Sequence, residues 1–187
     1  MAVGILALQG NVAEHAAALD RLGAATRMVR RPVDLEGLNA LVLPGGESTT
    51  MSMLLDSSGL RDPLSEWVAQ GRPTFGTCAG LVLLAERVID GRADQVGLGG
   101  LGVAVRRNGY GRQRFSFEAP VEIAGEEPLV GVFIRAPRIE AVDEGVEVLA
   151  TLEGEPVAVA SGALMACAFH PELAEDDRLH HRLLQLT

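Results

Sequence analysis

The sequence contains no lysine, and all sixteen of its basic residues are arginine. The chain therefore cannot form a Schiff base with a carbonyl substrate or with pyridoxal phosphate, because both reactions require a lysine amine. Aromatic residues make up only 4% of the chain. Aliphatic residues are abundant instead, as is typical of α/β proteins with buried parallel strands. No apolar run approaches the roughly 18 residues that cross a bilayer, so no membrane partner is expected.

Cysteine is also scarce, with two residues in 187. Two cysteines do not form a disulfide framework, and the N-terminus lacks the basic segment and cleavage site of a signal peptide. These features predict a reduced, cytoplasmic setting. The net charge of −9 argues against a nucleic-acid partner, which would select for a basic surface. The length fits one domain, so we expect residues 1–187 to form a single domain.

Apolar strands alternate with amphipathic helices in the first part of the chain. Asn11 and Glu14 predict a capping box at the start of the first helix. The predicted strands and helices of this part lie at 3–8, 12–22, 25–29, 38–43, 49–55, 63–70 and 74–77. Further strands and a closing helix are predicted at 103–105, 115–123, 130–134, 146–152, 157–160, 164–169 and 177–186. We therefore expect a three-layer α/β sandwich: a mostly parallel central sheet, helices on both faces and some antiparallel edge strands.

The most informative stretch is Gly76-Thr77-Cys78-Ala79-Gly80, which joins a short apolar run to an apolar segment at helical spacing. Its form is that of a nucleophile elbow, a sharp strand-to-helix turn usually written G-x-S-x-G. Glycines are needed there because neighbouring backbones approach closely. The N-terminus of the following helix favours the thiolate of Cys78. The stretch predicts a cysteine nucleophile, although these five residues alone also fit a buried structural cysteine.

A histidine and a glutamate follow the last predicted strand as His170-Pro171-Glu172. Pro171 disfavours a helix, and side chains at positions i and i+2 of an extended segment project to the same side. A carboxylate at this spacing can accept a hydrogen bond from one imidazole nitrogen and orient the other toward a nucleophile. Taken alone, a loop histidine beside a solvated glutamate fits equally well. Beside the elbow, the order of the residues favours a Cys78-His170-Glu172 triad.

The loop Pro44-Gly45-Gly46-Glu47-Ser48-Thr49 ends another predicted strand. Binding loops of open α/β sheets lie beyond the carboxyl ends of the strands, so we expect this loop to adjoin the elbow. The backbone N–H groups of Gly46 and Ala79 are our candidates for an oxyanion hole. The loop also suits a turn in which Ser48 or Thr49 caps a helix, and the two roles are compatible.

Other patterns do not predict a site. Gly97-x-Gly99-x-x-Gly102 matches a dinucleotide fingerprint by letter, but a strand-like segment follows where the fingerprint requires a helix. His180 and His181 are neighbours and cannot share a helix face, and no Cys/His ligand spacing is present. We therefore expect neither a metal nor a cofactor. Cys167 lies in an apolar strand and is interpreted as a core residue, while His15 receives no role.

These motifs together resemble the glutaminase subunit of the two-component pyridoxal 5′-phosphate synthase, within the class I (triad) glutamine amidotransferases. The elbow and the His-Pro-Glu segment are typical of triad amidotransferases in general. The matches run in order along almost the whole chain: Leu8-Gln9-Gly10, Leu43-Pro44-Gly45-Gly46-Glu47-Ser48-Thr49-Thr50-Met51, Phe75-Gly76-Thr77-Cys78-Ala79-Gly80-Leu81, Arg107-Asn108-x-Tyr110-Gly111-Arg112-Gln113, Val132-Phe133-Ile134-Arg135-Ala136-Pro137 and Phe169-His170-Pro171-Glu172-Leu173.

The resemblance implies an activity and a set of site residues. Cys78 would attack the side-chain amide of L-glutamine, giving a glutamyl thioester and ammonia. His170 would move the proton, Glu172 would orient His170, and water would release glutamate. The glutamine contacts that the resemblance implies are Gly46, Glu47, Ser48, Arg107, Ile134 and Arg135.

The resemblance also implies a partner. Members of the family pass ammonia to a separate barrel-shaped synthase subunit, which uses ribose 5-phosphate and glyceraldehyde 3-phosphate, in a large hetero-oligomeric complex. The absence of lysine agrees with this arrangement, because imine chemistry would then belong to the partner. The first helix resembles the partner-facing element of the family, although Ala13 stands where a basic residue is common.

Two other functions fit part of the pattern. The chain could be the glutaminase of a different biosynthetic synthase, such as one of an indole or purine pathway. A non-enzymatic redox sensor could use an exposed, low-pKa thiol at Cys78 on a similar scaffold. The pairing of Glu172 with His170 and the Gly-Gly loop argue against the sensor.

Overall fold

The computed structural model describes residues 1–91, 96–110 and 116–187. Its largest element is a sheet of nine strands. In spatial order they are β2 (Ala25–Val29), β1 (Ala2–Leu6), β3 (Ala40–Leu43), β4 (Thr74–Thr77), β12 (Leu164–Cys167), β11 (Glu155–Ser161), β10 (Glu147–Leu152), β7 (Ser116–Ile123) and β8 (Leu129–Ile134). The strands from β2 to β12 are parallel, and those from β11 to β8 extend the sheet by antiparallel pairing.

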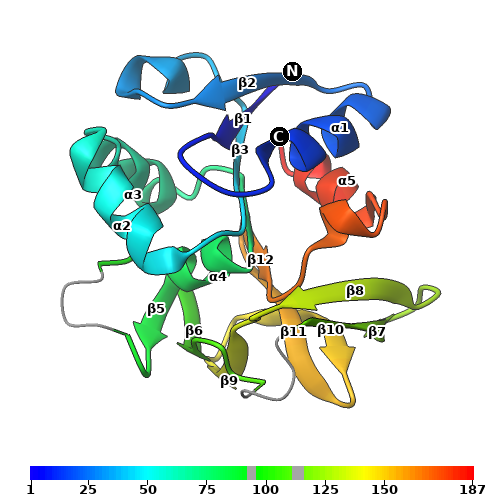
Figure 1. Cartoon of the computed structure of the whole chain (residues 1–187). Coiled ribbons are helices and arrows are strands. Elements are labelled where there is room, and N and C mark those ends of the chain that lie inside the picture. The colour runs from blue at the N-terminus through cyan, green and yellow to red at the C-terminus, as the bar shows by residue number, and fades with distance from the viewer. Residues whose placement is uncertain (92–95, 111–115) are drawn as a thin grey trace.

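Helices cover both faces of the parallel part. The helices are α1 (Val12–Arg21), α2 (Ser48–Ser57), α3 (Arg61–Ala69), α4 (Ala79–Leu84) and α5 (Arg178–Gln185). Figure 1 shows α1 and α5 on one side of β1 and β3, with α2 and α3 on the other. The predicted three-layer α/β sandwich is confirmed. No helix in the described ranges has the length and apolar character needed to span a membrane.

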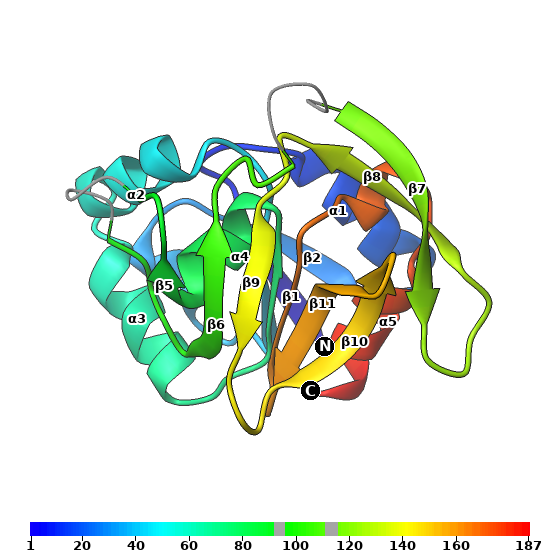
Figure 2. The ribbon, with the colours of Figure 1, turned by 90° about the horizontal axis from the view of Figure 1, so that it is seen from below.

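A smaller sheet lies beneath α4 and contains β5 (Ala85–Val88), β6 (Leu101–Arg106) and β9 (Arg138–Val142). It faces the viewer in Figure 2. The sequence predicted β6, but β5 and β9 were missed. Strand β5 follows α4 without a break, and both β5 and β9 are short and carry charged residues. Phe115, the expected start of one strand, and residues 111–113 of the matched motif lie outside the described ranges.

The register of the parallel strands places the functional segments at one edge of the sheet. Strands β3, β4 and β12 are fully buried along their length. Leu43 pairs with Gly76, and Cys167 pairs with Thr77, so the three strands end level with one another. Because parallel strands present their carboxyl ends on the same side, the segments that follow β3, β4 and β12 emerge together there.

Candidate active site

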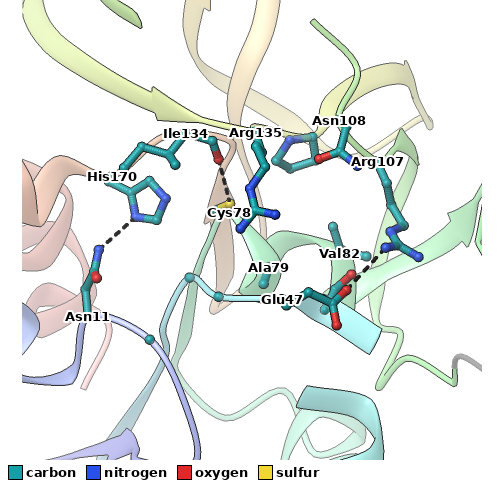
Figure 3. A pocket seen from close by; sticks show the side chains of 15 residues that line it. Asn11, Glu47, Cys78, Ala79, Val82, Arg107, Asn108, Ile134, Arg135 and His170 are labelled. Atoms are coloured by element: carbon teal, nitrogen blue, oxygen red, sulfur yellow. Dashed lines mark hydrogen bonds and ion pairs between the residues drawn. The ribbon is translucent and has the colours of Figure 1, made fainter. Parts of the chain in front are cut away.

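A cavity of about 200 Å³ opens at this edge of the sheet. Every predicted site residue except Glu172 lines it (Figure 3): Gly46, Glu47, Ser48, Cys78, Ala79, Arg107, Ile134, Arg135 and His170. These residues come from the loop after β3, the elbow after β4, the turn after β6, the end of β8 with the residue that follows it, and the segment after β12. Positions widely separated in the sequence therefore surround one space large enough for an amino acid.

Cys78 has the backbone conformation of a nucleophile elbow. Its φ of 49° lies in the left-handed region, which is strained for a residue with a side chain. Its backbone N–H donates to the carbonyl oxygen of Cys167 at 2.8 Å, which holds the turn against β12. Its Sγ lies 3.9 Å from the carbonyl oxygen of Ile134, to which the thiol can donate. The sulfur is thereby held at the floor of the cavity, beside the N-terminus of α4.

His170 and Glu172 form a hydrogen-bonded pair. Nδ1 of His170 lies 2.8 Å from Oε1 of Glu172, and both side chains are buried. Their geometry differs from the predicted extended segment, because Pro171 begins the short 3₁₀ helix η2 (Pro171–Leu173). Pro is well tolerated in the first turn of a helix, which explains the error. The N–H of His170 donates to the carbonyl oxygen of Val132 at 2.9 Å and anchors the segment to β8.

The surroundings of His170 favour its charged form. Burial lowers the pKa of His170, but hydrogen bonds with Cys78 and Glu172 outweigh burial and raise the pKa to about 10. Burial likewise raises the pKa of Glu172, but the hydrogen bond from His170 leaves it below its ordinary value. The ring is therefore an imidazolium held by a carboxylate at neutral pH. Since Nδ1 faces Glu172, Nε2 is the nitrogen left for Cys78.

Glu47 organises the loop between β3 and α2. Its carboxylate accepts hydrogen bonds from the N–H groups of Thr49 at 3.0 Å and Thr50 at 2.7 Å. Glu47 is thus the N-cap of α2, and the prediction that Ser48 or Thr49 caps this helix is wrong. Burial raises the pKa of Glu47, but the bonds from Thr50 and Thr49 outweigh it and lower the pKa to about 2. Arg107 also pairs with this carboxylate at 3.2 Å (Figure 3).

Two predicted contacts come from the end of β8 and the residue that follows it. Ile134 presents its carbonyl oxygen to the thiol (Figure 3), and Arg135 also lines the cavity. Among the described residues, five that are not glycine have a positive φ, and Cys78, Asn108 and Arg135 of these five line the cavity. Strained backbone of this kind gathers where a site requires a particular side-chain direction.

The structure adds Asn11 to the site. The side chain of Asn11 makes no helix-capping hydrogen bond, so the predicted capping box is wrong. Its Nδ2 instead donates to Oε1 of Glu172 at 3.1 Å and lies 3.3 Å from Nδ1 of His170. Gln9 was also missed as a loop contact, and its Oε1 accepts from the N–H of Glu47 at 3.3 Å. In the sequence, only the family match at Leu8-Gln9-Gly10 indicated that this region belongs to the site.

A buried pair of histidines, His15 and His180, lies beside Glu172. Nδ1 of His15 lies 2.8 Å from Nε2 of His180, and both residues are completely buried. The other nitrogen of His15 lies 3.2 Å from Oγ1 of Thr77 and 3.5 Å from Oε1 of Glu172. Burial lowers the pKa of His15, and burial lowers that of His180 to about 3. Both rings are therefore neutral at pH 7.

We expect the free energy of unfolding to fall as the pH drops below 6.5. The unfolded chain protonates His15 and His180 near 6.5, whereas the folded chain keeps them neutral, His180 down to about 3. Protons therefore favour the unfolded state, at about 1.4 kcal/mol per pH unit for His180, and His15 adds a contribution of the same sign. Urea unfolding between pH 6 and 5 measures the slope, because the raised pKa of His170 has an opposite effect only at higher pH. His180→Phe should reduce it, while the exposed His181→Phe should not; equal slopes in all three proteins would contradict the prediction.

An elbow cysteine, a histidine–glutamate pair and a Gly-Gly loop at one edge of a largely parallel sheet define the class of the triad glutamine amidotransferases. The model of the SNO glutamine amidotransferase family matches residues 5–186. The chain belongs to this family.

Curated relatives and a solved structure agree with the assignment. The chain is 54% identical over 185 residues to pyridoxal 5′-phosphate synthase subunit PdxT of Salinispora tropica, with 95% of this chain and 92% of that one covered. It is 50% identical over 189 residues to the protein of the same name from Corynebacterium jeikeium, with 100% and 97% covered. A crystal structure of a glutamine amidotransferase superimposes with a TM-score of 0.92 at 49% identity, over 98% of this chain and 97% of that one.

Proposed function

We propose that this chain hydrolyses L-glutamine to L-glutamate and ammonia through Cys78, His170 and Glu172, as the glutaminase subunit of a pyridoxal 5′-phosphate synthase. The observation that carries the proposal is the buried hydrogen bond of 2.8 Å between His170 and Glu172, with His170 and Cys78 lining the same cavity. The curated relatives are named as subunits of pyridoxal 5′-phosphate synthase, which supports a role in pyridoxal 5′-phosphate synthesis.

In the proposed reaction the thiolate of Cys78 attacks the amide carbon of glutamine. The N–H groups of Gly46 and Ala79 would stabilise the developing oxyanion. The imidazolium of His170 gives its proton to the departing nitrogen, so that ammonia leaves and a glutamyl thioester remains. His170 then removes a proton from water, which attacks the thioester and releases glutamate and the thiolate.

The remaining contacts suit the polar ends of the substrate. We propose Gly46, Glu47, Ser48, Arg107, Ile134 and Arg135 as the glutamine-binding residues. Carbonyl and carboxylate groups of Ile134 and Glu47 can accept from the substrate ammonium, and a guanidinium can pair with its carboxylate. The reaction requires a reduced thiol, and both cysteines are unpaired, so a cytoplasmic location is part of the proposal.

Ammonia release from glutamine tests the proposal. The chain is assayed alone and with the synthase subunit from the same organism, and ammonia and glutamate are both measured. We expect equal amounts of the two products and a higher rate with the synthase subunit. An absence of ammonia under both conditions would contradict glutaminase activity. A rate that the synthase subunit leaves unchanged, with no pyridoxal phosphate formed, would contradict the proposed partner.

A further inference from the structure

His15 contacts two parts of the proposed active site, the elbow strand and the carboxylate that holds His170. Its Nε2 faces Oγ1 of Thr77, the residue before the nucleophile, and Oε1 of Glu172, the carboxylate of the triad, at 3.2 and 3.5 Å. Thr77 belongs to β4 and Glu172 to η2, whereas His15 lies in α1. A single ring on a third element therefore spans the distance between the elbow and the histidine–glutamate pair.

Hydrogen-bond chemistry assigns the tautomer of His15. One possibility is that Nδ1 of His15 carries the proton and donates it to Nε2 of His180. The lone pair on Nε2 of His15 would then face the Glu172 carboxylate. His180 would also have a buried N–H on Nδ1, for which the described residues provide no acceptor. If His180 instead donates from Nε2 to Nδ1 of His15, the Nε2–H of His15 points toward Thr77 and Glu172. A buried N–H without an acceptor is costly, so the second arrangement is favoured.

Neighbouring side chains hold the rings of His15 and His180 in place beside each other. Phe75 lies edge-on to His180, with ring centroids 5.3 Å apart. Arg21 of α1 makes two hydrogen bonds, of 2.8 and 2.6 Å, to Asp177 at the start of α5, which ties the two helices together. Among the buried side-chain atoms that the structure describes, only Oε2 of Glu172 and Nδ1 of His180 lack a hydrogen-bond partner. The Glu172 carboxylate therefore depends on its Oε1 contacts for its position.

We propose that His15 is a positioning residue for glutamine hydrolysis, with its Nε2–H directed by His180 toward Thr77 and Glu172 so that His170 is kept aligned with Cys78. This inference rests on the proposed function. His15 does not touch the substrate cavity, so its removal should lower the rate of the chemical step and leave glutamine binding nearly unchanged. Groups that orient metal ligands from behind contribute roughly 10- to 100-fold to affinity or activity, and we expect an effect of the same size here.

The test compares His15→Leu, which removes the N–H donor, with His15→Gln, whose amide can donate from a similar position. The exposed His181→Leu is the matched control. With the synthase subunit present, we expect kcat to fall roughly 10- to 100-fold in His15→Leu with KM within about two-fold of the wild-type value, and to recover substantially in His15→Gln. Wild-type kcat in a folded His15→Leu, or equal loss in both His15 variants, would overturn the proposal.

The alkylation rate of Cys78 with iodoacetamide separates this inference from the proposed function. It reports the alignment of His170 with the thiol even if glutamine proves not to be the substrate. We expect slower alkylation in His15→Leu, recovery in His15→Gln and no change in His181→Leu. If His15→Leu does not fold, His180→Phe replaces it, because this variant keeps His15 but removes the directing N–H. Unchanged alkylation in a folded His180→Phe would then overturn the proposal.

Discussion

Replacing Cys78 with alanine is expected to reduce glutamine hydrolysis to background, a loss on the order of 10⁶-fold in kcat. The loss is this large because no thioester can form without the sulfur, and His170 and Glu172 contribute little to catalysis without the nucleophile that they serve. Ammonia release in the presence of the synthase subunit measures it. The variant should still bind glutamine, since the other predicted contacts remain.

The second cysteine provides the matched control for this experiment. Cys167 is completely buried in β12, and its thiol donates to the carbonyl oxygen of Phe169 at 3.2 Å rather than facing the cavity. Burial also raises the pKa of the Cys167 thiol well above its ordinary value, which keeps it unreactive. Cys167→Ala should therefore retain activity with a modest loss of stability. Activity that survives in Cys78→Ala and disappears in Cys167→Ala would refute the assignment of the nucleophile.

Replacing Gly80 with alanine is expected to lower the free energy of unfolding by more than about 3 kcal/mol, beyond the usual cost of overpacking. A Cβ at this position would overlap the carbonyl oxygen of Leu43. That oxygen belongs to the backbone of a central strand and cannot move aside as the end of a flexible side chain can. The first turn of α4 would have to shift away from β3, which would also displace Cys78.

Urea unfolding of Gly80→Ala beside Gly162→Ala measures this effect. Gly162 lies in the turn between β11 and β12 with a φ of 57°, and a Cβ there would meet nothing within 4 Å. Its replacement should cost only the roughly 1–2 kcal/mol of placing alanine in the left-handed region. If Gly80→Ala lowers the free energy of unfolding no more than Gly162→Ala does, the prediction is wrong, because the close approach of α4 to β3 then leaves room for a side chain at position 80.

Some features of the site followed from short stretches of sequence because they depend on local backbone chemistry. The elbow around Cys78 is recognisable because only small residues allow a strand to turn so tightly into a helix. The alternation of apolar strands with amphipathic helices predicted the sandwich, and so placed the loops after β3, β4 and β12 at one edge. The helix-capping predictions were wrong at Asn11 and in the loop around Glu47. At both places several polar groups compete for the same hydrogen bonds.

The fold class, the family and the candidate nucleophile could be predicted from the amino-acid sequence, because periodicity, turn chemistry and short motifs involve a few neighbouring residues. Which side chains meet could not be predicted in this way. Asn11 is the N-cap residue of α1, but its side chain donates to Glu172 and not to the first turn of the helix. Glu47 is the N-cap of α2, and His15 lies between Thr77 and His180. These contacts join residues far apart in the chain, and they depend on strand register and helix packing, which no short stretch of sequence encodes.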